Sequence, residues 1–275
     1  MTAASARLKV ATVCMNSVLD KEANLQMFFH YMEEAAAQGA QLIVFPEISL
    51  QQNPGWGRLS VHEPTHAELK YLRDTAETVP GESTDSIVAK AEELGIFVVF
   101  GMTEKESDDG PLYNTSVFVG ADGVIGKYRK CNLWDAEHGG GNEHLCWKRG
   151  TELVVAGSPW GKVGLAICID MFHLLGPKLA ARGADLLVTT SAWPRVTGDN
   201  YEKFTVQNAV EAQRWHVVSN QVGSVGYGED YGHSRIVHPK GDIVADTGGR
   251  EGMVVAEIDL YVGRDAAEDA RANLI

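Results

Sequence analysis

The sequence predicts an α/β protein built on a mixed sheet, and two observations lead to this class. Short apolar runs rich in Val, Ile and Leu alternate with amphipathic stretches of helical spacing, an order typical of β-α-β units. Hairpin-like strands between Tyr113 and Lys130 indicate an antiparallel part in the same sheet. No Pro/Ser-rich linker, low-complexity tract or fixed-period repeat divides the 275 residues, so we expect one domain over residues 1–275.

The individual elements follow from apolar spacing. Apolar runs bounded by glycine or charge are the expected strands: Leu8–Val13, Gln41–Phe45, Ile96–Gly101, Ser116–Val119, Val163–Ile167, Asp185–Thr189, Val217–Ser219 and Met253–Ile258. Stretches with apolar residues at helical spacing are the expected helices: Lys21–Gln38, Asp85–Leu94, Pro177–Arg182 and Tyr201–Gln213.

Composition excludes several classes of protein. Apolar residues at 44% and charged residues at 22% are typical of a soluble globular chain, and no apolar stretch approaches the roughly 20 residues of a membrane span, so no membrane association is expected. The net charge of -13 comes without a basic run to follow a phosphate backbone, so nucleic-acid binding is not expected. The four cysteines are irregularly spaced, which favours a reducing compartment; we expect a cytoplasmic protein.

Cys168 is the candidate nucleophile. It follows the apolar run Val163–Ile167, and we expect a helix to begin near Phe172, which places the cysteine at a strand-to-helix turn. Such a turn exposes the thiol at the edge of the sheet and lets the backbone N–H of Ile169 donate to a developing oxyanion. The alternative is a buried structural cysteine, which is the commoner outcome for a cysteine in an apolar run.

Glu47 is the candidate general base. It comes directly after the strand Gln41–Phe45, and Pro46 ends that strand so that the carboxylate is presented in a fixed direction. Beside a thiol, such a carboxylate accepts the thiol proton as a general base. The alternative is an ordinary strand-end carboxylate paired with a surface cation, and the residues alone leave both interpretations open.

Lys130 is the candidate cation of the site. Strand alternation sends Tyr128 and Lys130 to one face and Arg129 to the other. A lysine beside a thiolate stabilises it, and also stabilises negative charge on a substrate carbonyl oxygen. The alternative is a solvated basic strand end, which is the better interpretation for Lys127 and is also open for Arg129.

Three short motifs, taken together, resemble the nitrilase superfamily of carbon–nitrogen hydrolases. They are Phe45-Pro-Glu47 after a strand, Tyr128-Arg-Lys130 after a hairpin and Cys168-Ile-Asp170 after a strand, in this order. The resemblance covers Leu8 to about Asp259 and continues through the segments Gly183–Val188, Asn208–Asn220, Gly232–Ser234 and Pro239–Gly241.

The resemblance implies roles, a fold and an assembly. Glu47 would be the base, Lys130 the oxyanion cation and Cys168 the nucleophile that forms a thioester acyl-enzyme, with no cofactor. A second active-site glutamate matches Glu143 if Gly150 is the glycine that follows it in relatives; Glu137 is the competing candidate. The implied fold is a four-layer α-β-β-α sandwich with mixed central sheets, which pairs with further copies as a homodimer or higher homo-oligomer.

The sequence differs from the family pattern at positions that would contact the substrate. Members that hydrolyse N-carbamoyl amino acids or dicarboxylic monoamides hold a substrate carboxylate with a cation just after the cysteine, and neither Met171 nor Phe172 provides one. Arg195 is the candidate replacement. Trp193 and Phe172 are candidate pocket walls, although large aromatic residues are more often plain core. Asn132 stands where the family usually has histidine.

The predicted reaction is hydrolysis of a small-molecule amide to a carboxylic acid and ammonia. Cys168-Ile-Asp170 favours the amidase branch, because the corresponding tripeptide at the nucleophile of strict nitrile hydrolysers resembles Cys-Trp-Glu. An N-carbamoyl amidohydrolase, a nitrilase, an acyltransferase and a noncatalytic binding module stay open as alternatives. His138, His144 and Cys146 match no familiar zinc spacing, so no metal is expected.

Overall fold

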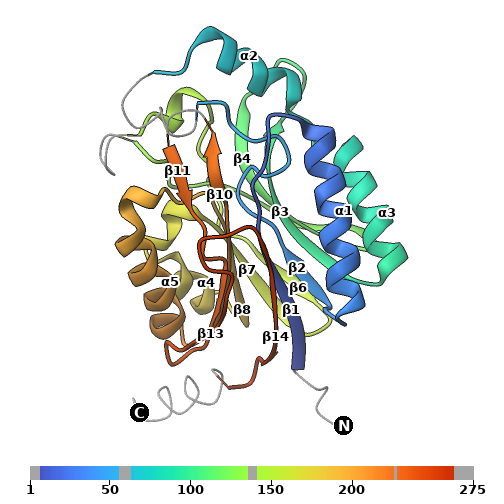
Figure 1. The fold of residues 1–275 in the computed structure, drawn as a ribbon, viewed down its shortest axis with the longest axis vertical. Coiled ribbons are helices and arrows are strands. Elements are labelled where there is room, and N and C mark those ends of the chain that lie inside the picture. Colours follow the sequence, from blue (N-terminus) through green and yellow to red (C-terminus); the bar gives the residue numbers. More distant parts are fainter. Residues whose placement is uncertain (1–6, 56–62, 136–140, 226–227, 263–275) are drawn as a thin grey trace.

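The computed structural model describes residues 7–55, 63–135, 141–225 and 228–262. Two six-stranded mixed sheets pack face to face, and helices cover both outer faces (Figure 1). The prediction of an α/β sandwich of four layers with mixed central sheets is therefore confirmed.

The first sheet comes mainly from the N-terminal half of the chain. Its strands lie in the order β14 (Gly252–Asp259), β1 (Arg7–Cys14), β2 (Leu42–Val44), β3 (Phe97–Lys105), β4 (Leu112–Gly120) and β5 (Gly123–Arg129). Strands β1, β2 and β3 are parallel, and the outer strands pair antiparallel.

The second sheet repeats this arrangement. Its order is β13 (Ile243–Asp246), β12 (Arg235–Val237), β9 (Trp215–Asn220), β8 (Leu186–Ser191), β7 (Gly161–Ile167) and β6 (Val155–Ser158), with β7, β8 and β9 parallel. A separate two-stranded ribbon joins β10 (Val222–Val225) to β11 (Gly228–Tyr231).

Helices form the two outer layers. Helices α1 (Lys21–Ala37) and α3 (Glu82–Leu94) cover the first sheet, and α4 (Leu175–Ala181) and α5 (Gly198–Ala212) cover the second (Figure 1). The remaining helix is α2 (His66–Thr75), and the short 3-10 turns are η3 (Glu143–Leu145), η4 (Cys168–Met171) and η5 (Arg195–Thr197).

All eight expected strands and all four expected helices are present, with shifted ends. The expected helix start near Phe172 is wrong. A 3-10 turn, Cys168–Met171, follows the strand, and α4 begins only at Leu175 because Leu174 adopts a left-handed φ of 48°. Helix α2 was not expected, although Thr65 and Glu68 form a capping box at its start.

The space between the two sheets is filled by apolar side chains from both. Val44 and Phe118 of the first sheet lie in one buried cluster with Leu165 and Val188 of the second. Two hydrogen bonds also join the sheets: Thr12 Oγ1 donates to Val218 O at 2.9 Å, and Ser219 Oγ donates to Val13 O at 2.6 Å. Among the described helices, none is long and apolar enough to cross a membrane.

Candidate active site

The candidate residues gather where strands of both sheets end. Glu47 follows β2, Lys130 follows β5 and Cys168 follows β7. In parallel sheets the carboxyl ends of the strands meet at one edge, which is where α/β proteins place their sites. The loops after these strands bring the acids and the lysine into direct contact.

Lys130 lies between two carboxylates. Its Nζ donates to Oε1 of Glu47 and to Oε1 of Glu143, each at 2.8 Å, and all three side chains are buried. Burial by itself lowers the pKa of Lys130, but the charges of Glu143 and Glu47 outweigh it and raise the pKa above its usual value. The lysine therefore stays charged.

Glu47 is held by four donors, which fix both carboxylate oxygens and its backbone. Oε1 accepts from Asn114 Nδ2 at 2.7 Å as well as from Lys130, and Oε2 accepts from the N–H of Ala192 at 2.9 Å. The Glu47 carbonyl accepts from Gln221 Nε2 at 2.9 Å. The sequence does not predict Asn114, Ala192 or Gln221 at Glu47, because each lies 67 or more positions further along the chain.

A glycine makes room for the Glu47 segment. A Cβ at Gly101 would lie 2.4 Å from the backbone nitrogen of Ile48 and 2.6 Å from the Cα of Glu47, both far inside van der Waals contact. The Gly101 N–H also donates to the carbonyl of Pro46 at 3.1 Å. The close approach of strand β3 to this loop thus requires the absence of a side chain.

Cys168 occupies a strained turn at the end of β7. Its φ of 46° is left-handed, a conformation that non-glycine residues seldom adopt and that recurs where a nucleophile is presented. The residue is buried, and burial together with the charge of Glu47 raises the pKa of its thiol well above the ordinary value, while Lys130 opposes this. Ile169 is the second residue of the 3-10 turn, and N–H groups in a first helical turn have no partner within the helix.

Asp170 ties the nucleophile turn to the lysine loop. Its Oδ2 accepts from Tyr128 Oη at 2.7 Å and from the N–H of Ile167 at 2.9 Å, and its Oδ1 accepts from Asn132 Nδ2 at 2.7 Å. Burial raises the pKa of Asp170 although these donors oppose the shift. The expected alternation on β5 holds, since Tyr128 turns toward the site while Arg129 turns away.

Glu143 lies on the far side of Lys130 from Glu47. Its Oε2 accepts from the N–H of Trp134 at 2.8 Å, and its own N–H donates to the Trp134 carbonyl at 3.1 Å. Burial raises the pKa of Glu143, with Lys130 acting in the opposite direction. Of the two candidates for the second glutamate, Glu143 contacts the lysine, and Glu137 lies outside the described residues.

The three expected substrate-binding residues lie in different settings. Trp193 is buried, and its N–H donates to Asn220 Oδ1 at 2.7 Å. Phe172 is 46% exposed and packs edge-on against Phe204. Arg195 pairs with Glu229 at 2.8 Å, so its charge is already matched.

Comparison with known proteins agrees with this architecture. The family model described as carbon-nitrogen hydrolase matches residues 9–268. The omega-amidase NIT2 of Homo sapiens is 32% identical over 270 residues, covering 93% of this chain and 89% of that protein. The omega-amidase NIT2 of Xenopus tropicalis is also 32% identical, covering 87% of this chain and 84% of that protein.

Solved structures of other proteins share this fold. The C. elegans NitFhit protein superposes with a TM-score of 0.83 at 28% identity; the match covers 98% of this chain and 65% of NitFhit. Saccharomyces cerevisiae Nit3, described as a member of branch 10 of the nitrilase superfamily, has a TM-score of 0.75 at 26% identity over 96% of this chain and 94% of Nit3.

The sandwich and the order of the motifs define an enzyme fold of the nitrilase superfamily, as the sequence predicted. The chain belongs to the carbon–nitrogen hydrolase family.

Proposed function

We propose that this carbon–nitrogen hydrolase cleaves a small amide to a carboxylic acid and ammonia, with Cys168 as nucleophile. Glu47 is the general base, Lys130 the cation that faces the oxyanion, and Glu143 the residue that positions Lys130. The observation that carries the proposal is the buried lysine at 2.8 Å from both glutamates, beside a cysteine on a left-handed turn.

The first half of the reaction forms the acyl-enzyme. Because the raised pKa keeps Cys168 a thiol, its proton passes to the Glu47 carboxylate as the sulfur attacks the amide carbon. The C–S bond forms, and the carbonyl oxygen takes the negative charge next to Lys130 Nζ and the N–H of Ile169. As the C–N bond breaks, Glu47 returns the proton to the leaving nitrogen, and ammonia departs.

The second half releases the acid. A water attacks the thioester carbon while Glu47 accepts its proton, and the same cation and N–H hold the second oxyanion. The C–S bond then breaks, the proton returns to sulfur, and the carboxylic acid leaves. Atoms and protons balance without any further reactant.

Two facts favour an amide over the rival substrates. The relatives at 32% identity are named as omega-amidases, and Cys168-Ile-Asp170 lacks the Cys-Trp-Glu pattern of strict nitrile hydrolysers. Carbamoyl, nitrile and acyl-transfer chemistry would use the same nucleophile, so product analysis separates them.

The test is ammonia release from panels of aliphatic and aromatic amides, N-carbamoyl compounds and nitriles. We expect release from amides, and a loss of at least about 10³-fold in Cys168→Ala. Cys14→Ala is the matched control, since Cys14 is also buried and free but belongs to another part of the fold. Release from nitriles or carbamoyl compounds alone would move the assignment to that branch, and Cys168-independent release would refute the mechanism.

The same proposal includes a single domain over residues 1–275, a cytoplasmic location and assembly as a homodimer or higher homo-oligomer. The single domain is supported by the apolar cluster shared between the two sheets, and the location by the four free cysteines. Assembly is supported by two exposed apolar side chains. Val210 lies on α5, and Phe172 packs against Phe204 of the same helix. Light scattering coupled to size-exclusion chromatography measures the oligomeric state.

A further inference from the structure

A small cavity lies between the segment after β8 and the β10–β11 ribbon. Its volume is about 220 Å³, and its lining residues are Arg195, Val222, Gly223, Glu229 and Asp230.

Backbone contacts join the wall of the cavity to the segment that holds Glu47. Asp230 forms a strand bridge with Pro194, and the N–H of Tyr231 donates to the Trp193 carbonyl at 2.8 Å. Ala192, which precedes Trp193, donates its N–H to the Glu47 carboxylate. Asp230 is therefore fixed to the same segment that holds the candidate base.

Asp230 is a buried acid without a partner among the residues that the structure describes. Only 6% of its surface is exposed, and within the described ranges its carboxylate makes no hydrogen bond or ion pair. Burial raises its pKa to about 8, and the charge of Glu47 adds to the shift. A nearly buried carboxyl group that lines a cavity and has no partner among the described residues is available to a ligand that enters the cavity.

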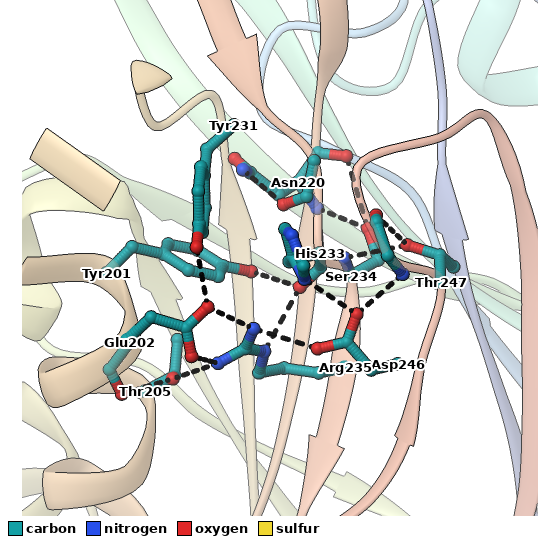
Figure 2. Close-up of polar contacts among 12 residues, drawn as sticks. Tyr201, Glu202, Thr205, Asn220, Tyr231, His233, Ser234, Arg235, Asp246 and Thr247 are labelled. Carbon is teal, nitrogen blue, oxygen red and sulfur yellow. Dashed lines mark hydrogen bonds and ion pairs between the residues drawn. The ribbon is translucent and has the colours of Figure 1, made fainter. Parts of the chain in front are cut away.

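The strand that carries Asp230 is firmly anchored on its other side. Figure 2 shows Tyr231 Oη donating to Glu202, at 2.9 Å, and Glu202 in turn paired with Arg235. Asn220 Nδ2 donates to the carbonyl of Gly232 at 2.7 Å. Successive side chains of a strand point to opposite sides, so the anchoring of Tyr231 fixes Asp230 in the direction of the cavity.

The charges around the cavity favour a cation. Arg195 is neutralised by Glu229, and Lys130 is shared by two carboxylates. A pKa of about 8 leaves Asp230 mostly protonated at neutral pH, and an ammonium group placed against it lowers this pKa, so that the Asp230 proton passes to water and an ion pair forms. A substrate carboxylate would instead raise the pKa of Asp230 further, as the charge of Glu47 does, whereas an ammonium group gains a charge-assisted hydrogen bond to the ionised form.

We propose that Asp230 is a specificity-determining residue that binds a protonated amino group at the far end of the substrate, so that the preferred substrates are amino-terminated aliphatic amides. This inference rests on the proposed amidase function and names the substrate class of the same site.

The test compares three amides that differ at the far end. They are 5-aminopentanamide, its neutral analogue hexanamide, and the monoamide of glutaric acid, each with shorter and longer homologues. We expect kcat/KM to favour the best amino-terminated amide over its neutral analogue by roughly 10- to 100-fold, as one hydrogen bond to a charged group gives. The preference collapses in Asp230→Asn and in Asp230→Ser, and it persists in the control Glu251→Gln, which removes an exposed acid outside the cavity.

A binding measurement separates the two proposals. Cys168→Ala removes the nucleophile and retains the cavity, so calorimetry reads the affinity of this protein for 5-aminopentanamide and its homologues without turnover. We expect tighter binding than for the neutral analogues, and loss of the difference when Asp230→Asn is added. Equal affinities, or a preference for the acidic monoamides, would overturn the role of Asp230. Absence of ammonia release from every amide would instead overturn the amidase proposal, whatever the affinities.

Discussion

Asn132 donates a hydrogen bond from Nδ2 to Oδ1 of Asp170 at 2.7 Å. Asn132 follows Lys130 by two positions, and Asp170 follows Cys168 by two positions, so this bond joins the loop of the cation to the loop of the nucleophile. An amide donor does not titrate, and the link therefore persists at every pH at which Asp170 keeps an acceptor oxygen.

Replacement of Asn132 by alanine leaves one oxygen of buried Asp170 without its donor. We expect Asn132→Ala to lower the free energy of unfolding by about 1–3 kcal/mol and to reduce kcat, because the nucleophile turn loses one of its ties. Urea unfolding followed by circular dichroism measures the first effect. Asn200→Ala, at an exposed position of α5, is the control. Equal free energies of unfolding for the two variants would contradict the role of the bond.

Replacement of Glu47 by glutamine should change turnover and thiol reactivity in opposite directions. Loss of the base lowers kcat by roughly 10²–10⁴-fold. Loss of its negative charge lowers the pKa of Cys168, since that charge is one cause of the raised value, so iodoacetamide should alkylate the thiol faster. Mass spectrometry of the alkylated Cys168 peptide reads the rate. Slower alkylation in Glu47→Gln than in native protein would count against this electrostatic coupling.

A methyl group at Gly101 should displace the base without touching the nucleophile. The added Cβ meets the backbone of Glu47 and Ile48, so Gly101→Ala is expected to cost about 1–3 kcal/mol of stability and to lower kcat/KM for the amide substrate. Gly157→Ala is the matched control, because a Cβ there meets nothing within 4 Å. Native-like kcat/KM in Gly101→Ala would show that the loop shifts freely.

The ion pairs of Glu104 should make stability depend on pH. Burial alone raises the pKa of Glu104, but Arg129 and Lys127, at 2.7 and 2.6 Å from its Oε1, lower it overall. A depressed pKa in the folded state gives stability that is present above the unfolded pKa of about 4.3 and is lost as the pH falls through the folded value.

We therefore expect Glu104→Gln to be less stable than the native protein by about 2–3 kcal/mol at neutral pH. This is below the about 3–5 kcal/mol of a fully buried pair, because both cations are partly exposed. The difference should shrink below about pH 4. Urea unfolding across this range tests it, and a difference that stays constant with pH would rule out ionisation of Glu104 as the cause.

Much of the fold was predictable from local pattern. The runs Leu8–Val13 and Val163–Ile167 are apolar on both faces, as expected for strands buried between a second sheet and a helix layer. Helix α2 was overlooked because only Leu72 of its residues is buried, which leaves a weak apolar pattern, although the capping box at Thr65 was a readable signal.

The site was predictable only in part. Glu47, Lys130 and Cys168 each follow a strand, and their order matched a known family. Asn114 lies within a strand, and nothing near it in the sequence indicates that its amide reaches a carboxylate 67 positions earlier. The burial of Asp230 likewise depends on the packing of its ribbon against Pro194, which strand periodicity does not predict.

The pairing of β14 with β1 has a consequence for biosynthesis. Residues of β14 lie opposite residues of β1 along its whole length, from Arg7 and Asp259 to Cys14 and Gly252. Strand β1 is translated first among the described strands and β14 last, so a ribosome-bound chain holds the edge of β1 unpaired until β14 has been made. Contacts between such distant segments form slowly. Until then the unpaired edge of β1 is open to pairing with other strands, including those of other chains.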